Sequence, residues 1–559
     1  MFAYATKTTG DEAMNWLRAV LIGLAFTHAP LLAASHADLL AAYKSFRIGA
    51  AVPVRDGVPD FSPAAMAARQ AHARASIAAL AAIDTSNWPV AERADLLLAL
   101  AEARSVDFQS TVLRQWERDP SWWATLDIGW GPKIDTAFTP PKLPLKFDAD
   151  RKALGAKLRA VPPTLAAART RLTDMRGDLV TLGLAHHRIE TRLYDRMARD
   201  LAASDPVLAR LASAAAAASR NFTAHLETEK PKVADRPSGI GRARMDWYLR
   251  YVLLFPYGYD HMRIVGEREW QRTMAFLKME EHEHRKTPMI EPVTTLAAFE
   301  ALRREADVDL LAFLRAEDIM TVPEWLTVPE PEGPYVMPAN QDPSASGPFD
   351  PPVQRNFFRE AEDRDPRTLR AHNVPGHLFD SLFHKRDTRP IRGDERLGFI
   401  DSSRLEGWAF YLEEMLVQAG WLDARPKARE IHYILMANRA ARLLPELKVQ
   451  SNEWNFDEAL ASLTGRTPYW MELNDDTAVY DMALYLRQPG LGINYYFGKL
   501  QIEELLVEVA LKQGKGFDLK SFHDNFIARG IVPIALTRWE MTGNDDQVKT
   551  MWNAPPIPD

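Results

Sequence analysis

A succession of helix-forming segments, separated by prolines and turn residues, runs along almost the whole chain and constrains its fold more than any other feature. Apolar residues recur at helical spacing in an alanine-rich stretch over residues 62–83, and a broad apolar stripe follows the helix start at Trp88 and Pro89. The same reasoning predicts helices within 150–229, broken near Pro162, Pro163 and Pro206, and over 245–284, 296–314, 426–444, 457–463, 478–486, 494–512 and 519–528.

One proline-rich stretch, over residues 320–338, looks extended and predicts a small β element beside the candidate site. We therefore expect a mostly α fold, a large multi-helix body with a deep internal cleft and one small β element. A loop of Gly, Pro, Ser and Asp over 340–352 suggests a division of the 559 residues. We predict an N-terminal helical region over 38–350 and a C-terminal helical region over 351–559 that carries the site.

The composition excludes several classes of function. Hydrophobic residues make up 47% of the chain and charged residues 26%, which is normal for a globular protein and excludes wholesale disorder. The formal net charge is −7 and no run of Lys and Arg stands out, so no nucleic acid partner is expected. Cysteine is absent, which excludes disulfides, thiolate metal sites and cysteine nucleophiles.

The N-terminal residues have the layout of a secretory signal peptide. A short basic start from Met14 leads into the apolar run 19–26, and Ser35-His36-Ala37 offers a small-x-small cleavage site. We predict a signal peptide over 1–37, with translation starting at Met14, and hence an exported protein, periplasmic or secreted. The run is too short for a transmembrane helix and no later stretch suffices, so no membrane span is expected. An ordinary amphipathic N-terminal helix is the alternative.

Two histidines five residues apart and a later glutamate form the candidate site. His372 and His377 stand on either side of a Pro-Gly pair, and Glu406 follows 29 residues after His377 in a segment of helical character. Imidazole and carboxylate ligands suit Zn²⁺, and three protein ligands leave a fourth position open for water or substrate. The alternative is that these are ordinary polar residues of half-buried helices.

Proline sets the expected local structure of this site. Pro375 lacks an N–H and presets φ, so a helix can begin there but does not easily run through it. We expect a helix over 375–386 with His372 in the incoming turn. On that helix His377, Asp380 and His384 share one face.

The C-terminal half resembles a known bacterial family, domain of unknown function 885, a relative of the gluzincin clan of zinc peptidases. Four stretches carry the resemblance in order: Pro375-Gly376-His377; Glu406-Gly407-Trp408-Ala409; Arg439-Ala440-Ala441-Arg442-Leu443; and Tyr485-Leu486-Arg487-Gln488-Pro489-Gly490, running on to Tyr495 and Gly498. The resemblance therefore implies a gluzincin-peptidase-like fold.

The metal motif is degenerate compared with the family pattern His-Glu-x-x-Pro-Gly-His-His. Ala371 stands at the first histidine, His372 at the glutamate that serves as general base, and Leu378 at the last histidine. Downstream, Gln450 ends a segment that usually reads Asp-Thr-Gly-Leu-His, and Leu484 replaces an arginine. The residues His377, Glu406 and Tyr495 are retained.

The resemblance implies a divergent, exported, metal-dependent hydrolase of short peptides or amides, with a metal-activated water as nucleophile. His372, His377 and Glu406 would hold the cation, Zn²⁺ by preference, and Tyr495 would stabilise the oxyanion. Another carboxylate would replace the missing base, or His372 itself would act; the carboxylate candidates are Asp380, Glu413 and Asp401. The predicted substrate contacts are Tyr485, Asn494 and Trp408.

A metal-free pseudoenzyme of the same fold, which binds a peptide or small molecule, is the alternative function. Ala371, Gln450 and Leu484 favour it, because each replaces a polar residue of the family pattern. His377, Glu406 and Tyr495 would then form a buried hydrogen-bonded network. A histidine beside the position that lost one looks like a relocated ligand, however, and this favours the hydrolase. Neither reading indicates an oligomeric state.

Overall fold

The computed structural model describes residues 35–129, 131–330, 349, 353 and 355–559. Residues 1–34 of the predicted signal peptide and residues 331–338 of the predicted extended stretch lie outside these ranges. The described part begins with Ser35 as the N-cap of the first helix, in a capping box with Asp38. The predicted cleavage site therefore lies at the start of this helix.

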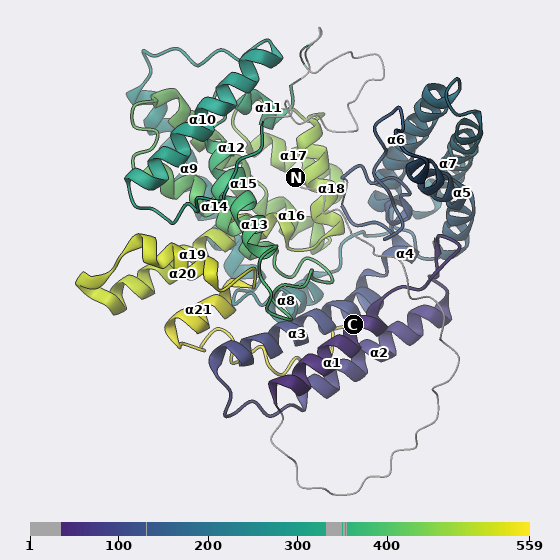
Figure 1. The fold of residues 1–559 in the computed structure, drawn as a ribbon, viewed down its shortest axis with the longest axis horizontal. Coiled ribbons are helices and arrows are strands. Elements are labelled where there is room, and N and C mark those ends of the chain that lie inside the picture. Colours follow the sequence, from purple (N-terminus) through teal and green to yellow (C-terminus); the bar gives the residue numbers. More distant parts are fainter. Residues whose placement is uncertain (1–34, 130, 331–348, 350–352, 354) are drawn as a thin grey trace, which may run out of the picture.

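The described residues of the first half form helices, connecting loops and one short hairpin. Three helices near the N-terminus lie along one edge of the molecule, and three longer ones form a group at its side (Figure 1). Its elements are α1 (His36–Ala50), β1 (Val54–Arg55), β2 (Val58–Pro59), α2 (Pro63–Ala81), α3 (Val90–Phe108), η1 (Gln109–Leu113), α4 (Gln115–Arg118), η2 (Pro120–Trp123), α5 (Asp148–Arg171), α6 (Gly177–Leu201), α7 (Pro206–Val233), α8 (Arg242–Tyr251), α9 (Tyr259–Glu283) and α10 (Leu296–Ala316).

The described residues of the second half form helices joined by turns and loops, without a strand, and they contain the candidate site. Its helices pack against α9 and α10 on the opposite side of the molecule from α5, α6 and α7 (Figure 1). Its elements are α11 (Phe357–Glu362), α12 (Arg367–Ala371), η4 (His372–Leu378), α13 (Phe379–His384), α14 (Ser402–Gln418), α15 (Pro426–Ala441), α16 (Leu443–Gln450), α17 (Phe456–Arg466), α18 (Asp476–Arg487), α19 (Leu491–Gln513), η5 (Gly514–Gly516), α20 (Leu519–Ala528) and α21 (Ile534–Thr542).

The mostly helical fold is confirmed, and several helix predictions come within three residues of the observed bounds. Two corrections concern helix ends. Helix α5 runs through Pro162 and Pro163, where a break is predicted. The helix predicted over 245–284 is two helices, α8 and α9, because the chain turns at Leu254, whose φ is +53°.

A small β element is present near the N-terminus of the described chain, whereas the prediction for residues 331–338 lies outside the described ranges. The two-stranded antiparallel sheet of the described residues pairs Val54 with Pro59 and Arg55 with Val58, and β2 contacts α5. Residues 320–330 contain no strand, although they look extended in sequence. Pro323 and Pro329 remove ladder donors there, which disfavours a strand over these described residues. The expected deep internal cleft stays a prediction.

The buried apolar side chains of the described residues form two large clusters, a third around the candidate site and a small fourth one around Leu422. Each large cluster joins residues from both predicted regions; for example, Trp123 shares one with Leu435, and Phe108 shares the other with Phe410. The boundary near residue 350 stays a prediction. The third cluster includes Phe379 of α13 and packs α10, α14, α19 and α20 around the site segment.

Candidate metal centre

The two histidines belong to one continuous helical segment, residues 367–384, whose middle part is the π-helical turn η4. Pro375 lies inside this turn, so the expected helix start at Pro375 is wrong and His372 is helical. A π-helix bonds residue i to i+5, and its wider turn brings residues five apart towards one face. Nε2 of His372 and Nε2 of His377 accordingly lie 3.0 Å apart.

Close packing against α14 holds the π turn in place. A Cβ added to Gly376 would lie 2.8 Å from the Cβ of Ala409, so only glycine allows this approach. The indole Nε1 of Trp408 donates a hydrogen bond to the carbonyl oxygen of Pro375 at 3.2 Å. Trp408 is fully buried, which argues against its predicted substrate contact. Two residues beyond Glu406 on a helix, it points to the far side of α14, into the core.

Helix α14 carries both carboxylates that contact His372. Glu406 and Glu413 are seven residues apart, so they lie on one face two turns from each other. A backbone contact with α19 fixes the position of this helix, because a Cβ on Gly407 would lie 2.5 Å from the Cα of Gly498. The two glycines therefore set how near α14 comes to α19.

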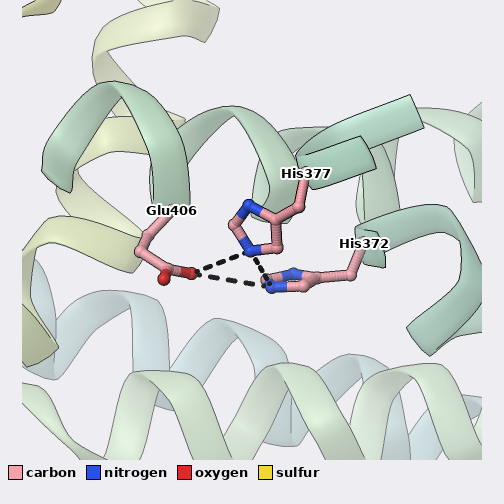
Figure 2. A group of neighbouring side chains, drawn as sticks. All are labelled: His372, His377 and Glu406. Carbon is pink, nitrogen blue, oxygen red and sulfur yellow. Dashed lines mark hydrogen bonds and ion pairs between the residues drawn. The ribbon is translucent and has the colours of Figure 1, made fainter. Parts of the chain in front are cut away.

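Three ligand atoms converge at the site (Figure 2). Oε2 of Glu406 lies 3.6 Å from Nε2 of His372 and 3.5 Å from Nε2 of His377. The three predicted ligands, which come from two segments, are thus brought together. The side chains of His377 and Glu406 are each 21% exposed, whereas that of His372 is 10% exposed. Solvent therefore reaches the site from the side of His377 and Glu406.

The opposite edge of the His372 ring faces a second carboxylate. Nδ1 of His372 lies 2.7 Å from Oε1 of Glu413, and the same oxygen lies 2.8 Å from Nη2 of Arg439. A carboxylate at Nδ1 favours the tautomer with its proton there, which leaves the Nε2 lone pair directed at His377 and Glu406. Sequence reasoning considered Glu413 only as a base and gave Arg439 no role, although the Arg439–Leu443 motif was a signal.

Electrostatics favours charged groups at the site despite its burial. Burial alone would raise the pKa of Glu406, but His377 and His372 outweigh it and hold the pKa well below 4.5. Burial alone would lower the pKa of His372, but the carboxylates of Glu406 and Glu413 raise it above 6.5. The two carboxylates therefore favour a cation between them, either a proton on His372 or a metal ion.

Tyr495 of α19 lies at the site as predicted. Its ring is nearly parallel to that of His372, with the centroids 6.4 Å apart. Burial, and then the charge of Glu406, raise the pKa of its hydroxyl well above 10, so it stays protonated and can donate a hydrogen bond. The guanidinium of Arg442 lies against the Tyr495 ring, with Cζ 5.1 Å from the ring centroid, and pairs with Asp481 at 2.9 Å.

The carboxylates considered as general base are each engaged with a cationic group. Asp380 is buried and accepts from Nη1 and Nη2 of Arg404 at 2.7 and 3.1 Å, which argues against its predicted catalytic role. Asp401 lies 3.2 Å from Nε of Arg396, and burial raises its pKa to about 7. Glu413 is held between His372 and Arg439 as described above.

The two other predicted substrate contacts are buried. Tyr485 is 1% exposed and packs against Gly492. Asn494 is also 1% exposed, and its amide donates a hydrogen bond to the hydroxyl of Ser402. Both positions argue against direct contact with substrate. Gln450 stands at the place of a family histidine. Its side-chain amide donates hydrogen bonds to the carbonyls of Tyr485 and Leu486 at 2.6 and 3.0 Å, so it links α16 to α18.

The donor set fits a zinc ion. Ligand atoms about 2.0–2.1 Å from zinc at tetrahedral angles lie roughly 3.4 Å from one another, and the observed separations of 3.0, 3.5 and 3.6 Å bracket that value. Oε2 of Glu406 is buried without a hydrogen-bond partner, and a cation would satisfy it. A carboxylate behind a ligand histidine is the usual outer-sphere partner at zinc sites.

A family model described as "Bacterial protein of unknown function (DUF885)" matches residues 45–541. The chain belongs to this family. Its match extends the resemblance of the C-terminal half to almost the whole chain. No curated protein matches the chain.

Two solved structures share the fold of this DUF885 protein. A candidate lipoprotein of unknown function from Shewanella oneidensis is 18% identical, with a TM-score of 0.67; the match covers 91% of this chain and 100% of that one. A candidate lipoprotein from Colwellia psychrerythraea is 14% identical, with a TM-score of 0.65 and coverage of 92% and 99%. Among the helices described here, none has the length and apolarity that crossing a membrane requires.

Proposed function

We propose that this DUF885 protein is a metal-dependent hydrolase of short peptides or amides. Zn²⁺ is the proposed cation, and His372, His377 and Glu406 are its proposed ligands. The observation that carries the proposal is the convergence of their three ligand atoms within 3.6 Å, at a site where the side chains of His377 and Glu406 are partly exposed. Three protein ligands with an open position are typical of catalytic zinc sites.

The residues around the ligands supply orientation and hydrogen-bond donation. Glu413, fixed by Arg439, keeps the proton of His372 on Nδ1 so that Nε2 is free to coordinate. Tyr495 stays protonated and donates its O–H to the oxygen that gains negative charge at the attacked carbonyl. Zinc, when bound, supplies Lewis-acid activation of water and of the carbonyl.

Proton removal from the nucleophile is the step in which this site departs from the family pattern. His372 stands at the position of the family's glutamate, the expected general base, and in this proposal it is a metal ligand. The three carboxylate candidates each face a cationic partner, so we infer that the proton passes to solvent beside His377 and Glu406. A relation to the gluzincin clan is part of this proposal, and the shared His377, Glu406 and Tyr495 support it.

Export to the periplasm or beyond is also proposed. The signal-peptide layout of residues 1–37 supports it, and so do the two structural neighbours, both described as candidate lipoproteins of bacteria. Their identity with this chain is too low to carry more than the fold, so the sequence pattern is the stronger support.

A metal-free binding protein is the second candidate function. The 3.0 Å separation of the two Nε2 atoms is a hydrogen-bond distance, so the histidines can pair without a cation. In that case one ring carries its proton on Nε2 and Glu406 accepts from the pair. Gln450 stands where the family has a histidine, and its side chain donates hydrogen bonds to two backbone carbonyls, which also favours this candidate.

Elemental analysis of the purified protein decides between the two. The hydrolase requires about one zinc or other divalent ion per chain, lost in both His377→Ala and Glu406→Gln. His384→Ala, which removes a partly buried histidine seven residues further along the same helical segment, is the matched control and should retain the metal. A folded wild-type chain that stays metal-free after zinc loading would sink the hydrolase and leave the binding protein.

A further inference from the structure

A second polar site lies away from the metal centre, where the loop before α8 meets the segment between η1 and α4. It is a pocket of about 390 Å³, and arginines from three different segments line it. These arginines are Arg114, Arg118, Arg176, Arg242 and Arg244, whereas Asp559 is the one acidic residue of the lining. Five guanidinium groups around one small space require compensation by negative charge.

Nearby carboxylates compensate three of the five arginines. Arg114 and Arg176 share Asp174, each at 2.6 Å, and Arg114 also pairs with Glu117 at 2.7 Å. Arg242 pairs with Asp260 outside the pocket. These pairs leave the charges of the other two guanidinium groups to be explained.

Arg118 and Arg244 have only carbonyl partners within the described structure. Arg118 donates to the carbonyls of Val112 and Ser238 at 3.0 and 3.2 Å, and Arg244 donates through Nε to that of Pro558 at 3.1 Å. Carbonyl dipoles satisfy the donors but do not neutralise the charge. An unpaired charge in a protein interior is costly unless a counterion approaches it.

Arg118 is the more deeply buried of these two arginines. It is 6% exposed, and its Nε is buried without a hydrogen-bond partner. Burial lowers its pKa to about 10, and repulsion from Arg176, Arg114 and Arg244 adds to this effect against the attraction of Asp174. Asp559, the acidic residue of the lining, is exposed and forms no ion pair with Arg118 or Arg244 in the described structure, so the pocket contains two guanidinium groups without a carboxylate partner, one of them buried.

The backbone adds further donors at the same place. Helix α8, ten residues long, begins at Arg242, and its N-cap Gly241 has no side chain to cap the first amides. Gly241 adopts φ +88°, and a Cβ there would meet nothing within 4 Å, so the helix start is open. The loop is held rigidly, because Gly239 N–H donates to Oδ1 of Asn452 and Gly241 N–H donates to the carbonyl of Gln450, both at 2.8 Å.

We propose that this pocket binds a phosphate group, either free or as the phosphoryl group of a small molecule. The lining combines guanidinium groups from three segments with the amides of a helix N-terminus, which suits a tetrahedral dianion better than a planar carboxylate. The two guanidinium groups without a carboxylate partner supply the affinity, and the glycines allow close approach to the backbone. The site is separate from the proposed zinc centre.

Calorimetric titration of the metal-free protein with inorganic phosphate, at constant ionic strength, tests the proposal. One phosphate per chain should bind, with a Kd below about 1 mM, and acetate should bind at least tenfold more weakly. Arg244→Gln should weaken phosphate binding at least tenfold. Arg188→Gln is the matched control, because it removes an exposed arginine of α6 that pairs with Glu227 elsewhere.

Two further variants keep the result interpretable. His377→Ala should bind phosphate as the wild type does, which excludes the metal centre as the place of binding. Arg118→Gln should abolish binding if it folds, and Arg244→Gln decides the matter if it does not. Absence of phosphate binding, equal binding of acetate, or wild-type affinity in Arg244→Gln would each overturn the proposal.

Discussion

Gly407 of α14 and Gly498 of α19 meet backbone to backbone, so that a Cβ on Gly407 would lie 2.5 Å from the Cα of Gly498. This contact sits next to Glu406 on one helix and three residues after Tyr495 on the other. Because side chains at neighbouring positions of two touching helices lie close together, the glycine pair determines the distance between the proposed ligand and the proposed oxyanion donor.

Gly407→Ala should therefore destabilise the protein and disturb the metal centre together. We expect a loss of about 3 kcal/mol or more in the free energy of unfolding, since backbone atoms cannot relax as flexible side chains do. Urea unfolding measures the loss, and elemental analysis should show reduced zinc. Gly465→Ala in α17 is the control, because its Cβ would meet nothing within 4 Å. Equal stability of both variants would contradict the close contact.

Glu413→Gln should weaken metal binding although Glu413 is no ligand. Loss of the carboxylate at Nδ1 releases the orientation and tautomer of His372, and such changes reduce metal affinity about 10–100-fold. Competition with a chelator measures the affinity. Asp481→Asn is the control, since it also neutralises a buried carboxylate beside an arginine, Arg442, and is not paired with a histidine. Equal affinities in the two variants would exclude the orienting role.

Asp380→Asn should reduce stability and leave zinc content unchanged. It leaves the buried guanidinium of Arg404 without its bidentate partner, which costs about 3–5 kcal/mol. The double variant Asp380→Leu, Arg404→Met should regain most of that loss, as measured by urea unfolding. A stable, zinc-loaded Asp380→Asn protein without hydrolytic activity would instead restore Asp380 as the general base.

Acid should destabilise the protein in part through His523. This buried ring accepts a hydrogen bond from Tyr411 O–H at 2.9 Å and donates one to the carbonyl of Ile319 at 2.7 Å. Burial lowers its pKa from 6.5 to about 4. Between pH 6.5 and 4, the unfolded chain therefore binds a proton at His523 that the folded chain does not. The stability that the neutral ring contributes is complete above pH 6.5 and is lost as the pH falls towards 4.

His523→Gln should accordingly flatten the pH dependence of stability. An amide can replace both hydrogen bonds without titrating, so the loss of stability between pH 7 and 4 should shrink by about 2–3 kcal/mol. Urea unfolding of the metal-free protein across this range measures it. The exposed His282→Gln variant is the control and should keep the wild-type slope. A wild-type slope in His523→Gln would refute the buried neutral ring.

Much of the fold follows from local sequence signals. Helix α10 begins at the predicted Leu296, and α20 has the predicted bounds, because apolar spacing and caps act over a few residues. The ligand set His372, His377 and Glu406 could also be proposed from residue types and the family pattern. The turn around Pro375 could not, because tertiary contacts of Gly376 and Trp408 stabilise a π turn that local rules disfavour.

By itself, the sequence determined the helical architecture, the family and the residues that can bind a metal, since these depend on periodicity, composition and motif. Only the tertiary structure decided which charges pair. It assigned Asp380 to Arg404, Glu413 to His372, and Trp408 to the core, and it gathered five arginines around one pocket. Partners in such pairs come from distant segments, and their selection depends on burial, which no local pattern records.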